Sequence, residues 1–168
     1  MIKQTPLKCL GTNGRGAMMR AHAAWSQIRS KYDGLLAANL NMDYPDDRHI
    51  MLSRCRAWLV FQGYSQDVGI ECQEQFWLQN SDGGTWRFTI PCGQGQHVSL
   101  LFSAWMIVNE NHVALTVNRQ PAGDASDRLP DDKPVRLIIR PDIDDRNFHE
   151  NTKAFMGPEH HFPNSCRV

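Results

Sequence analysis

The chain has 168 residues, of which 41% are hydrophobic and 21% are charged, and its 18 Lys and Arg residues balance its 18 Asp and Glu residues. This composition is typical of a globular protein of about one domain and excludes disorder as the main state. The basic residues are spread evenly along the chain, so no cluster could neutralise several phosphates, and nucleic acid is excluded as a partner.

The cysteines predict a reducing compartment. They form no Cys-x-x-Cys pair, which argues against zinc and redox sites and favours free thiols in a cytoplasmic protein. The first residues lack an apolar signal region, and the longest apolar runs, such as residues 100–108, are far shorter than the roughly 20 residues that span a bilayer. We therefore expect neither secretion nor a membrane partner. The five cysteines are Cys9, Cys55, Cys72, Cys92 and Cys166.

Helical spacing occurs only near the N-terminus. Apolar residues recur every three or four positions between Ala17 and Tyr32, which predicts one short N-terminal helix there. The glycines at Gly11, Gly14 and Gly16 predict a tight turn just before it. This turn lacks the Gly-Lys-Ser/Thr ending of a phosphate-binding loop.

From Gly34 onward the apolar period is two, which predicts strands. Seven runs separated by turn residues indicate an all-β fold, a β-sandwich. Residues 98–108 and 113–117 flank a polar turn and predict an antiparallel hairpin, whereas residues 121–134 have the composition of a surface loop. The expected strands cover residues 35–40, 50–62, 68–78, 86–90, 97–108, 113–117 and 135–140.

The run from residue 50 to 62 separates into two faces. One set of alternate residues, which includes Cys55, Ala57 and Leu59, is predicted to face the core. The other set includes two arginines and Trp58. Arginines beside an aromatic ring are typical of a surface that meets another layer or a ligand.

No catalytic or metal-binding pattern stands out. Paired aspartates such as Asp46 and Asp47 lie at loop edges, where solvated turn residues are common, and sequence does not give the carboxylate separation that glycoside hydrolysis requires. His160 and His161 beside Glu159 lack the fixed spacing of metal ligands. No nucleophile elbow is present. We expect no catalytic residue, no metal and no cofactor.

The five tryptophans are many for this length, and an indole offers a flat apolar face with one polar N–H. Trp105 lies in an apolar run and is expected in the core. Trp58 and Trp86 each stand near an arginine and are candidates for stacking on a sugar ring, with core or interface packing as the competing interpretation.

An ordered set of short motifs carries a family resemblance over about residues 10–151. Together the motifs resemble the N-terminal domain of the bacterial and archaeal type of glycogen debranching enzyme, amylo-α-1,6-glucosidase. Two positions depart from that family's pattern: Ala17 replaces a glycine and Asp33 replaces a histidine. The motifs are Thr12-Asn13-Gly14-x-Gly16, Arg29-Ser30-Lys31-Tyr32-Asp33-Gly34-Leu35-Leu36, Asp47-Arg48-x-x-Met51-Leu52-Ser53, Val135-Arg136-Leu137-Ile138-Ile139-Arg140-Pro141 and Arg146-Asn147-Phe148-His149.

The resemblance implies a β-supersandwich domain placed ahead of an (α/α)6 barrel, and the barrel carries the catalytic carboxylates. Residues 1–168 are then part or most of a noncatalytic domain, with the barrel absent and late strands missing or supplied from outside. Its implied role is to pack on the barrel and to help position α-glucan, such as glycogen or limit dextrin.

The resemblance also implies which residues contact the barrel or lie near the glucan. They are Thr12, Asn13, Gly14, Gly16, Tyr32, Gly34, Arg146 and His149. Two alternatives remain open. One is a standalone carbohydrate-binding or protein-interaction sandwich, and the other is a small hydrolase that uses the region around His149.

Overall fold

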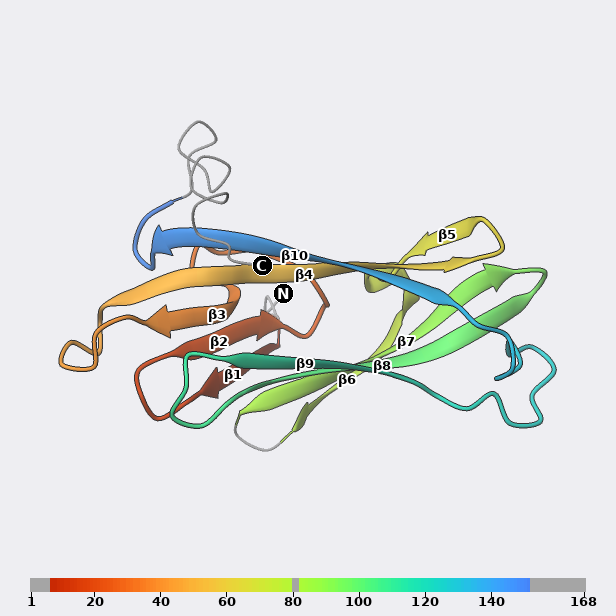
Figure 1. Ribbon diagram of the computed structural model, residues 1–168, viewed down its shortest axis with the longest axis horizontal. Coiled ribbons are helices and arrows are strands. Elements are labelled where there is room, and N and C mark those ends of the chain that lie inside the picture. The colour runs from red at the N-terminus through yellow and green to blue at the C-terminus, as the bar shows by residue number, and fades with distance from the viewer. Residues whose placement is uncertain (1–6, 80–81, 152–168) are drawn as a thin grey trace, which may run out of the picture.

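The computed structural model describes residues 7–79 and 82–151 as two antiparallel sheets (Figure 1). Sheet A has the order β1-β2-β3-β4-β10, with β5 also paired to β4, and sheet B has the order β6-β7-β8-β9. The predicted β-sandwich is thus confirmed. Sheet A holds β1 (Lys8–Thr12), β2 (Met18–His22), β3 (Gly34–Asn39), β4 (Arg48–Phe61), β5 (Tyr64–Asp67) and β10 (Arg136–Asn147); sheet B holds β6 (Gln73–Gln79), β7 (Gly83–Gly93), β8 (Gln96–Met106) and β9 (Val113–Arg119).

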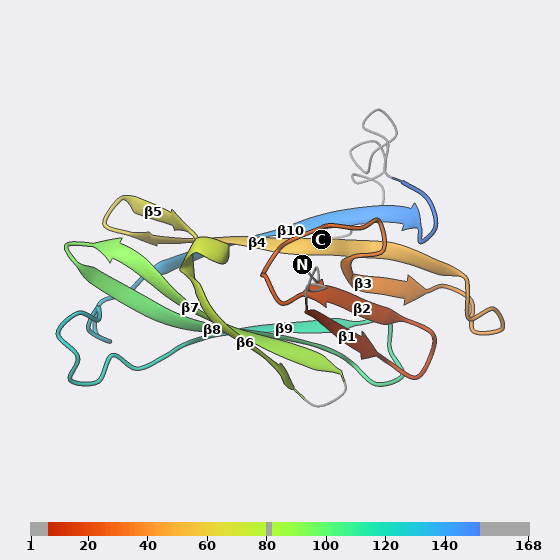
Figure 2. The same cartoon turned by 180° about the vertical axis from the view of Figure 1, so that it is seen from behind.

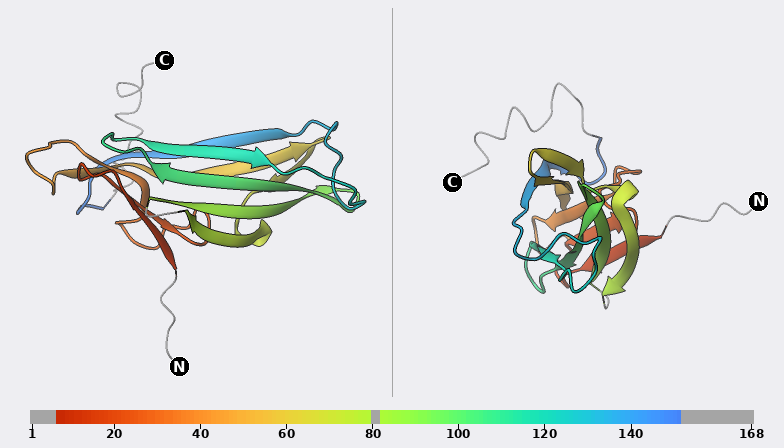
Figure 3. Two further views of the ribbon diagram at one scale, coloured as in Figure 1. Left: turned by 90° about the horizontal axis from the view of Figure 1, so that it is seen from below. Right: turned by 90° about the vertical axis from the view of Figure 1, so that its right-hand side faces the viewer.

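The molecule is elongated, with long strands along its main axis (Figures 2 and 3). Strand β4 pairs with three other strands of sheet A. β10 pairs along one edge of β4, whereas β3 and β5 pair with successive parts of its other edge. The predicted hairpin is also confirmed, because β8 and β9 pair antiparallel from Met106–Val113 to Leu100–Arg119.

The predicted N-terminal helix is wrong. Residues 18–22 form strand β2, which pairs with β1 on one side and β3 on the other, and residues 23–33 form a loop in which Ser26 has a left-handed φ of 61°. Backbone pairing with two neighbours outweighs a weak helical spacing that lasts only a few turns. The described residues contain one 3-10 turn, η1 (Ile70–Cys72), and no helix there could cross a membrane.

The 23–33 loop supplies the centre of the core. Trp25 is 3% exposed and inserts between the sheets, where its ring centroid lies 5.0 Å from that of Trp86 and 5.2 Å from that of Phe102. Phe88 packs edge-on against both Trp25 and Phe102. The apolar spacing that predicted a helix therefore reflects one buried anchor in a loop.

The faces of β4 follow the predicted parity along much of its length. Cys55, Ala57 and Leu59 are buried, while the intervening arginines face outward and bind Asp142 of β10. Ile50 departs from this pattern, because it is fully buried in a second cluster with Ala37 and Phe148. Register shifts in the β3–β4 and β4–β10 pairings separate the two regions.

Cys9, Cys55, Cys72 and Cys92 are free thiols, and all four are buried. Burial raises the pKa of Cys9 to about 11, and burial together with the nearby Asp142 charge raises the pKa of Cys55 to about 11. Such thiols remain protonated and weakly nucleophilic. Cys166 lies outside the described residues.

We predict that Phe102→Ala lowers the free energy of unfolding by about 3–5 kcal/mol, because it leaves a cavity beside Trp25 and Phe88. Urea unfolding followed by tryptophan fluorescence measures the change. Leu78→Ala is the matched control, since Leu78 is 52% exposed, and it should change stability by about 0.5 kcal/mol or less. Equal losses in the two variants would contradict the described core.

Candidate functional site

The turn that carries the Thr-Asn-Gly motif is fixed by Asn13. Its side-chain oxygen accepts hydrogen bonds from the backbone N–H groups of Arg15 and Ala17, at 2.8 and 3.1 Å. Its amide donates to the carbonyl oxygen of Glu110 at 2.7 Å. Asn13 is only 1% exposed, so it holds this turn against the β8–β9 turn and has almost no surface of its own.

Asn39 and Asn111 join the loop after β3 to the same β8–β9 turn. The side chain of Asn111 accepts from the N–H of Asn39 and donates to its carbonyl oxygen, at 3.2 and 2.6 Å. The Asn39 amide donates to the carbonyl oxygen of Tyr44 at 2.9 Å. Turns 13–17, 40–47 and 107–112 therefore form one fixed end of the sandwich, called the loop end below (Figure 1).

The motif glycines in this turn are required for different reasons. Gly14 and Gly16 have φ values of 76° and 94°, which side-chain-bearing residues rarely adopt. A Cβ on Gly16 would also lie 3.0 Å from the Asn39 amide. Gly14 is exposed, as is Thr12, whereas Gly16 is partly buried.

The loop end exposes large apolar side chains. They lie on turns 40–47 and 107–112, and more than half of each side chain is exposed in the part of the chain that the structure describes. Large apolar side chains exposed close together commonly mark an interaction site. The side chains are Leu40, Met42, Tyr44 and Val108, which are 55%, 65%, 66% and 66% exposed.

The remaining predicted interface residues come together beside this end. Arg146 donates to the carbonyl oxygen of Lys31 at 2.6 Å, and the Lys31 ammonium donates to the carbonyl oxygen of His149 at 2.6 Å. The Tyr32 ring lies 4.8 Å from Phe148 and 5.9 Å from His149, centroid to centroid. The structure thus joins Tyr32 to residues more than 110 positions away.

Arg48 links this cluster to the motif turn. Its Nε donates to the carbonyl oxygen of Gly16 at 2.6 Å, and its guanidinium lies 6.0 Å from the centroid of the Phe148 ring. Gly34 is buried, and a Cβ there would lie 3.3 Å from Ile50. Of the eight predicted residues, Thr12, Gly14 and His149 are exposed, and the other five are buried or partly buried.

Asp33 is a buried carboxylate whose importance the sequence did not reveal. It has no exposed surface, yet one oxygen accepts hydrogen bonds from the N–H groups of Arg29 and Ser30 and lies 2.9 Å from His22 Nε2. The other oxygen is held by cations from two strands. These are Arg20 Nε at 3.3 Å and Lys8 Nζ at 3.7 Å.

Burial of Asp33 acts to raise its pKa, but the Arg29 N–H and the hydrogen bond and charge of His22, together with Lys8, outweigh that effect and lower it. The carboxylate is therefore ionised and structural. The sequence marked this position only by its departure from the motif, in which Asp33 replaces a histidine.

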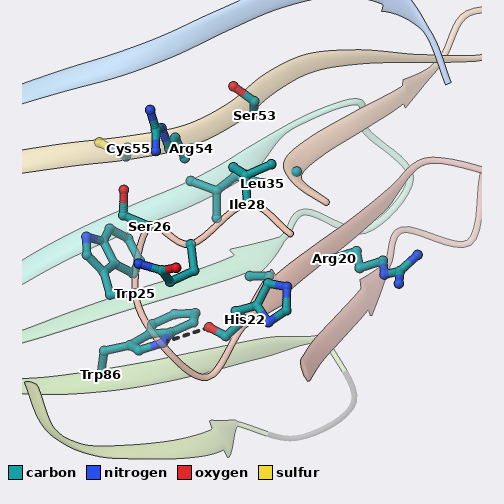
Figure 4. Close-up of a pocket in the computed structure, with 13 residues that line it drawn as sticks. Arg20, His22, Trp25, Ser26, Ile28, Leu35, Ser53, Arg54, Cys55 and Trp86 are labelled. Carbon is teal, nitrogen blue, oxygen red and sulfur yellow. Dashed lines mark hydrogen bonds between the residues drawn. The ribbon is translucent and has the colours of Figure 1, made fainter. Parts of the chain in front are cut away.

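The cavity next to this carboxylate is too small for a sugar. It is lined by His22, Trp25, Arg54 and Trp86, among others, and its volume of about 20 Å³ is room for about one water molecule (Figure 4). Trp86 donates its indole N–H to the carbonyl oxygen of His22 at 3.2 Å.

Of the two interpretations of Trp86, the structure confirms core packing and excludes stacking on a sugar. Trp86 is 0% exposed, because it lies on the inner face of β7 and packs against Trp25. Trp58 lies on the outer face of sheet A, opposite Ile138, and is partly exposed. The expectation that Trp105 lies in the core is wrong: its strand neighbours Ala104 and Met106 face the core, and Trp105 is partly exposed on the other side of β8. Trp77, which the sequence did not single out, is 36% exposed.

No group of three or more His, Cys, Asp or Glu residues that could hold a metal ion occurs among residues 7–79 and 82–151. Glu159, His160 and His161 lie outside those residues. The described histidines most closely placed to carboxylates, such as His22, take part in buried or surface ion pairs.

The geometry defines an antiparallel β-sandwich whose candidate site is a set of fixed loops and outward-facing aromatic rings. The chain matches the family model described as glycogen debranching enzyme N terminal over residues 8–166. It belongs to this family, which confirms the resemblance drawn from its motifs. Comparisons with curated proteins and with solved structures found no significant match.

We predict that Asp33→Asn lowers the free energy of unfolding by about 3 kcal/mol at pH 7, because it leaves the partly buried cations Lys8 and Arg20 without their counter-charge. The lowered pKa of Asp33 gives this contribution a defined pH dependence: it is complete above the unfolded value of about 3.9 and is lost as the pH falls through the folded value. The stability difference from wild type should therefore shrink below about pH 4.

Urea unfolding between pH 7 and pH 3 measures this difference. Asp132→Asn is the control, because the Asp132 side chain is 75% exposed. A difference between Asp33→Asn and wild type that stays constant over this range would contradict an ionised, structural Asp33.

Proposed function

We propose that this chain is a noncatalytic domain that docks on the catalytic domain of a glycogen debranching enzyme and helps to position α-glucan there. Family membership supports the class of enzyme. The observation that carries the docking role is the loop end, where four large apolar side chains are exposed on rigidly held turns.

Rigidity makes this surface suited to docking. Ordering a mobile loop on binding costs about 0.5–1.5 kcal/mol for each immobilised side chain. The asparagine hydrogen bonds at Asn13, Asn39 and Asn111 fix the backbone of these turns in advance. More of the free energy from apolar burial is then available for binding.

The course of the chain favours the same end. Strand β10 ends at Asn147, and the residues after it pack on Tyr32, near the loop end (Figure 1). The described part of the chain therefore ends beside the loop end, which supports docking there.

The predicted contact residues divide into two roles in this proposal. Thr12, Gly14 and His149 are exposed and would touch the catalytic domain. Asn13, Gly16, Tyr32, Gly34 and Arg146 would support that surface from below, through the contacts described above. The acid and base carboxylates are assigned to the catalytic domain, and the four buried free thiols support the cytoplasm as its location.

We predict that the triple variant Leu40→Ser, Met42→Ser, Tyr44→Ser weakens docking at least tenfold. Three exposed apolar side chains would no longer be buried, and each is worth about 1.5 kcal/mol or more when fully buried. Isothermal titration of the chain into the catalytic barrel of the debranching enzyme from the same organism measures the Kd, and circular dichroism checks the fold.

The matched control is Ile138→Ser with Ile139→Ser, which changes exposed apolar residues of β10 that are 46% and 45% exposed. It should leave the Kd within about twofold, since it lies outside the loop end. If wild type does not bind the barrel, or if the control loses binding and the triple variant keeps it, the docking role is refuted. A standalone module predicts the first of these outcomes.

A further inference from the structure

The outer face of sheet B has an unusual composition. Side chains alternate across a strand, so Trp86 and Phe88 point into the core whereas Thr85, Arg87 and Thr89 lie on the opposite side of β7. Arg87 and Thr89 are partly exposed there, whereas Thr85 is buried, with its hydroxyl 2.8 Å from that of Ser103. The strand register extends this outward set across the sheet. The outward residues are mainly uncharged polar or aromatic: Gln75, Trp77 and Gln79 of β6, Thr85, Arg87 and Thr89 of β7, His97, Ser99, Leu101, Ser103 and Trp105 of β8, and Ala114, Thr116 and Asn118 of β9.

Arg87 of β7 and Trp77 of the edge strand β6 lie next to each other on this face. The Arg87 guanidinium lies 5.7 Å from the centroid of the Trp77 ring, which is 36% exposed. Among the described residues, the buried Nε of the Arg87 side chain has no hydrogen-bond partner.

Two open hollows lie on either side of this pair. One has a volume of about 720 Å³, and its lining includes Arg87, Thr89, His97, Ser99, Gln120 and Asp127. The other has a volume of about 570 Å³, is lined by Gln79, Asp82 and Trp105, and reaches Val108 at the loop end. Residues of β6 and β8 line both hollows, which therefore lie at different positions along the same strands.

We propose that the outer face of sheet B binds a linear segment of α-1,4-linked glucan. The Trp77 ring stacks on one glucose unit, while Arg87 donates to its hydroxyl oxygens and the polar side chains of the larger hollow bind the next units. Gly83, which pairs with Trp105, and Thr89 are six positions apart on β7. This distance is about 20 Å at the usual rise of a strand, which is room for several glucose units.

Charge selects this ligand over an anionic one. Arg87 is the one fixed charge among the outward residues listed for sheet B, and in the larger hollow Glu74 and Asp127 offset Arg87 and Arg128. A phosphate site would need an excess of donors with positive charge. A neutral polymer of hydroxyl groups instead needs a flat apolar face and both donors and acceptors, and this surface offers all three.

This inference deepens the proposed function, because the smaller hollow leads to the loop end where the catalytic domain would dock. Glucan held on the outer face of sheet B would then be directed toward that domain. The two ideas can fail independently, since docking is measured without glucan and glucan binding is measured without the catalytic domain.

The test is the affinity of the full chain for maltoheptaose, measured by isothermal titration, together with its mobility in native gels that contain glycogen. Wild type should bind and be retarded. Trp77→Ala should weaken binding at least tenfold, and Arg87→Gln should weaken it several-fold, with unchanged circular dichroism. Trp77→Phe should restore part of the lost affinity because it keeps an aromatic face.

Trp58→Ala is the matched control, because Trp58 is a partly exposed tryptophan on the opposite outer face. It should leave the affinity within twofold, and so should the triple variant at the loop end. The inference is overturned if wild type does not bind maltoheptaose. It is also overturned if Trp58→Ala abolishes binding that Trp77→Ala retains, which would assign stacking to sheet A as the sequence predicted.

Discussion

The position of the loop before β3 depends on one buried carboxylate. Asp33 draws Lys8 of β1 and both Arg20 and His22 of β2 to a single point, and it closes the turn at residues 29–30 through backbone hydrogen bonds. A buried charge is tolerated only when it is paired and hydrogen-bonded to this degree. The same loop places Trp25 in the core and Tyr32 beside Phe148, so the core and the candidate interface share this constraint.

Local patterns predicted most of sheet B and the centre of sheet A. The period of two in residues 97–108 and 113–117 corresponds to β8 and β9, whose antiparallel pairing a short polar turn requires. The buried parity of Cys55, Ala57 and Leu59 was also correct, because a face buried along a strand leaves a regular record in the sequence. Strands β1, β2 and β5 were missed, since each has only four or five residues.

What the sequence could not show depends on distant contacts. Trp86 and Arg87 are neighbours, yet one is fully buried and the other faces outward, and only the register against β6 and β8 decides which. Of the two stacking candidates in the sequence, Trp86 is therefore buried and Trp58 is partly exposed. In the same way Arg146 and Lys31 are 115 positions apart, and their hydrogen bond exists only because β10 returns along β4.

Strand β8 connects the two proposed surfaces. Trp105 lies on the outer face of sheet B, and Met106 is buried with its N–H bonded to the Asp82 carbonyl oxygen. Val108 is at the loop end only two residues further on, so the distance and direction between the surfaces are fixed by backbone hydrogen bonds. A glucan segment bound at one surface would have a high effective concentration at a domain docked on the other. Weak binding on the outer face of sheet B is then sufficient to position substrate, which agrees with its open form and its balanced charges.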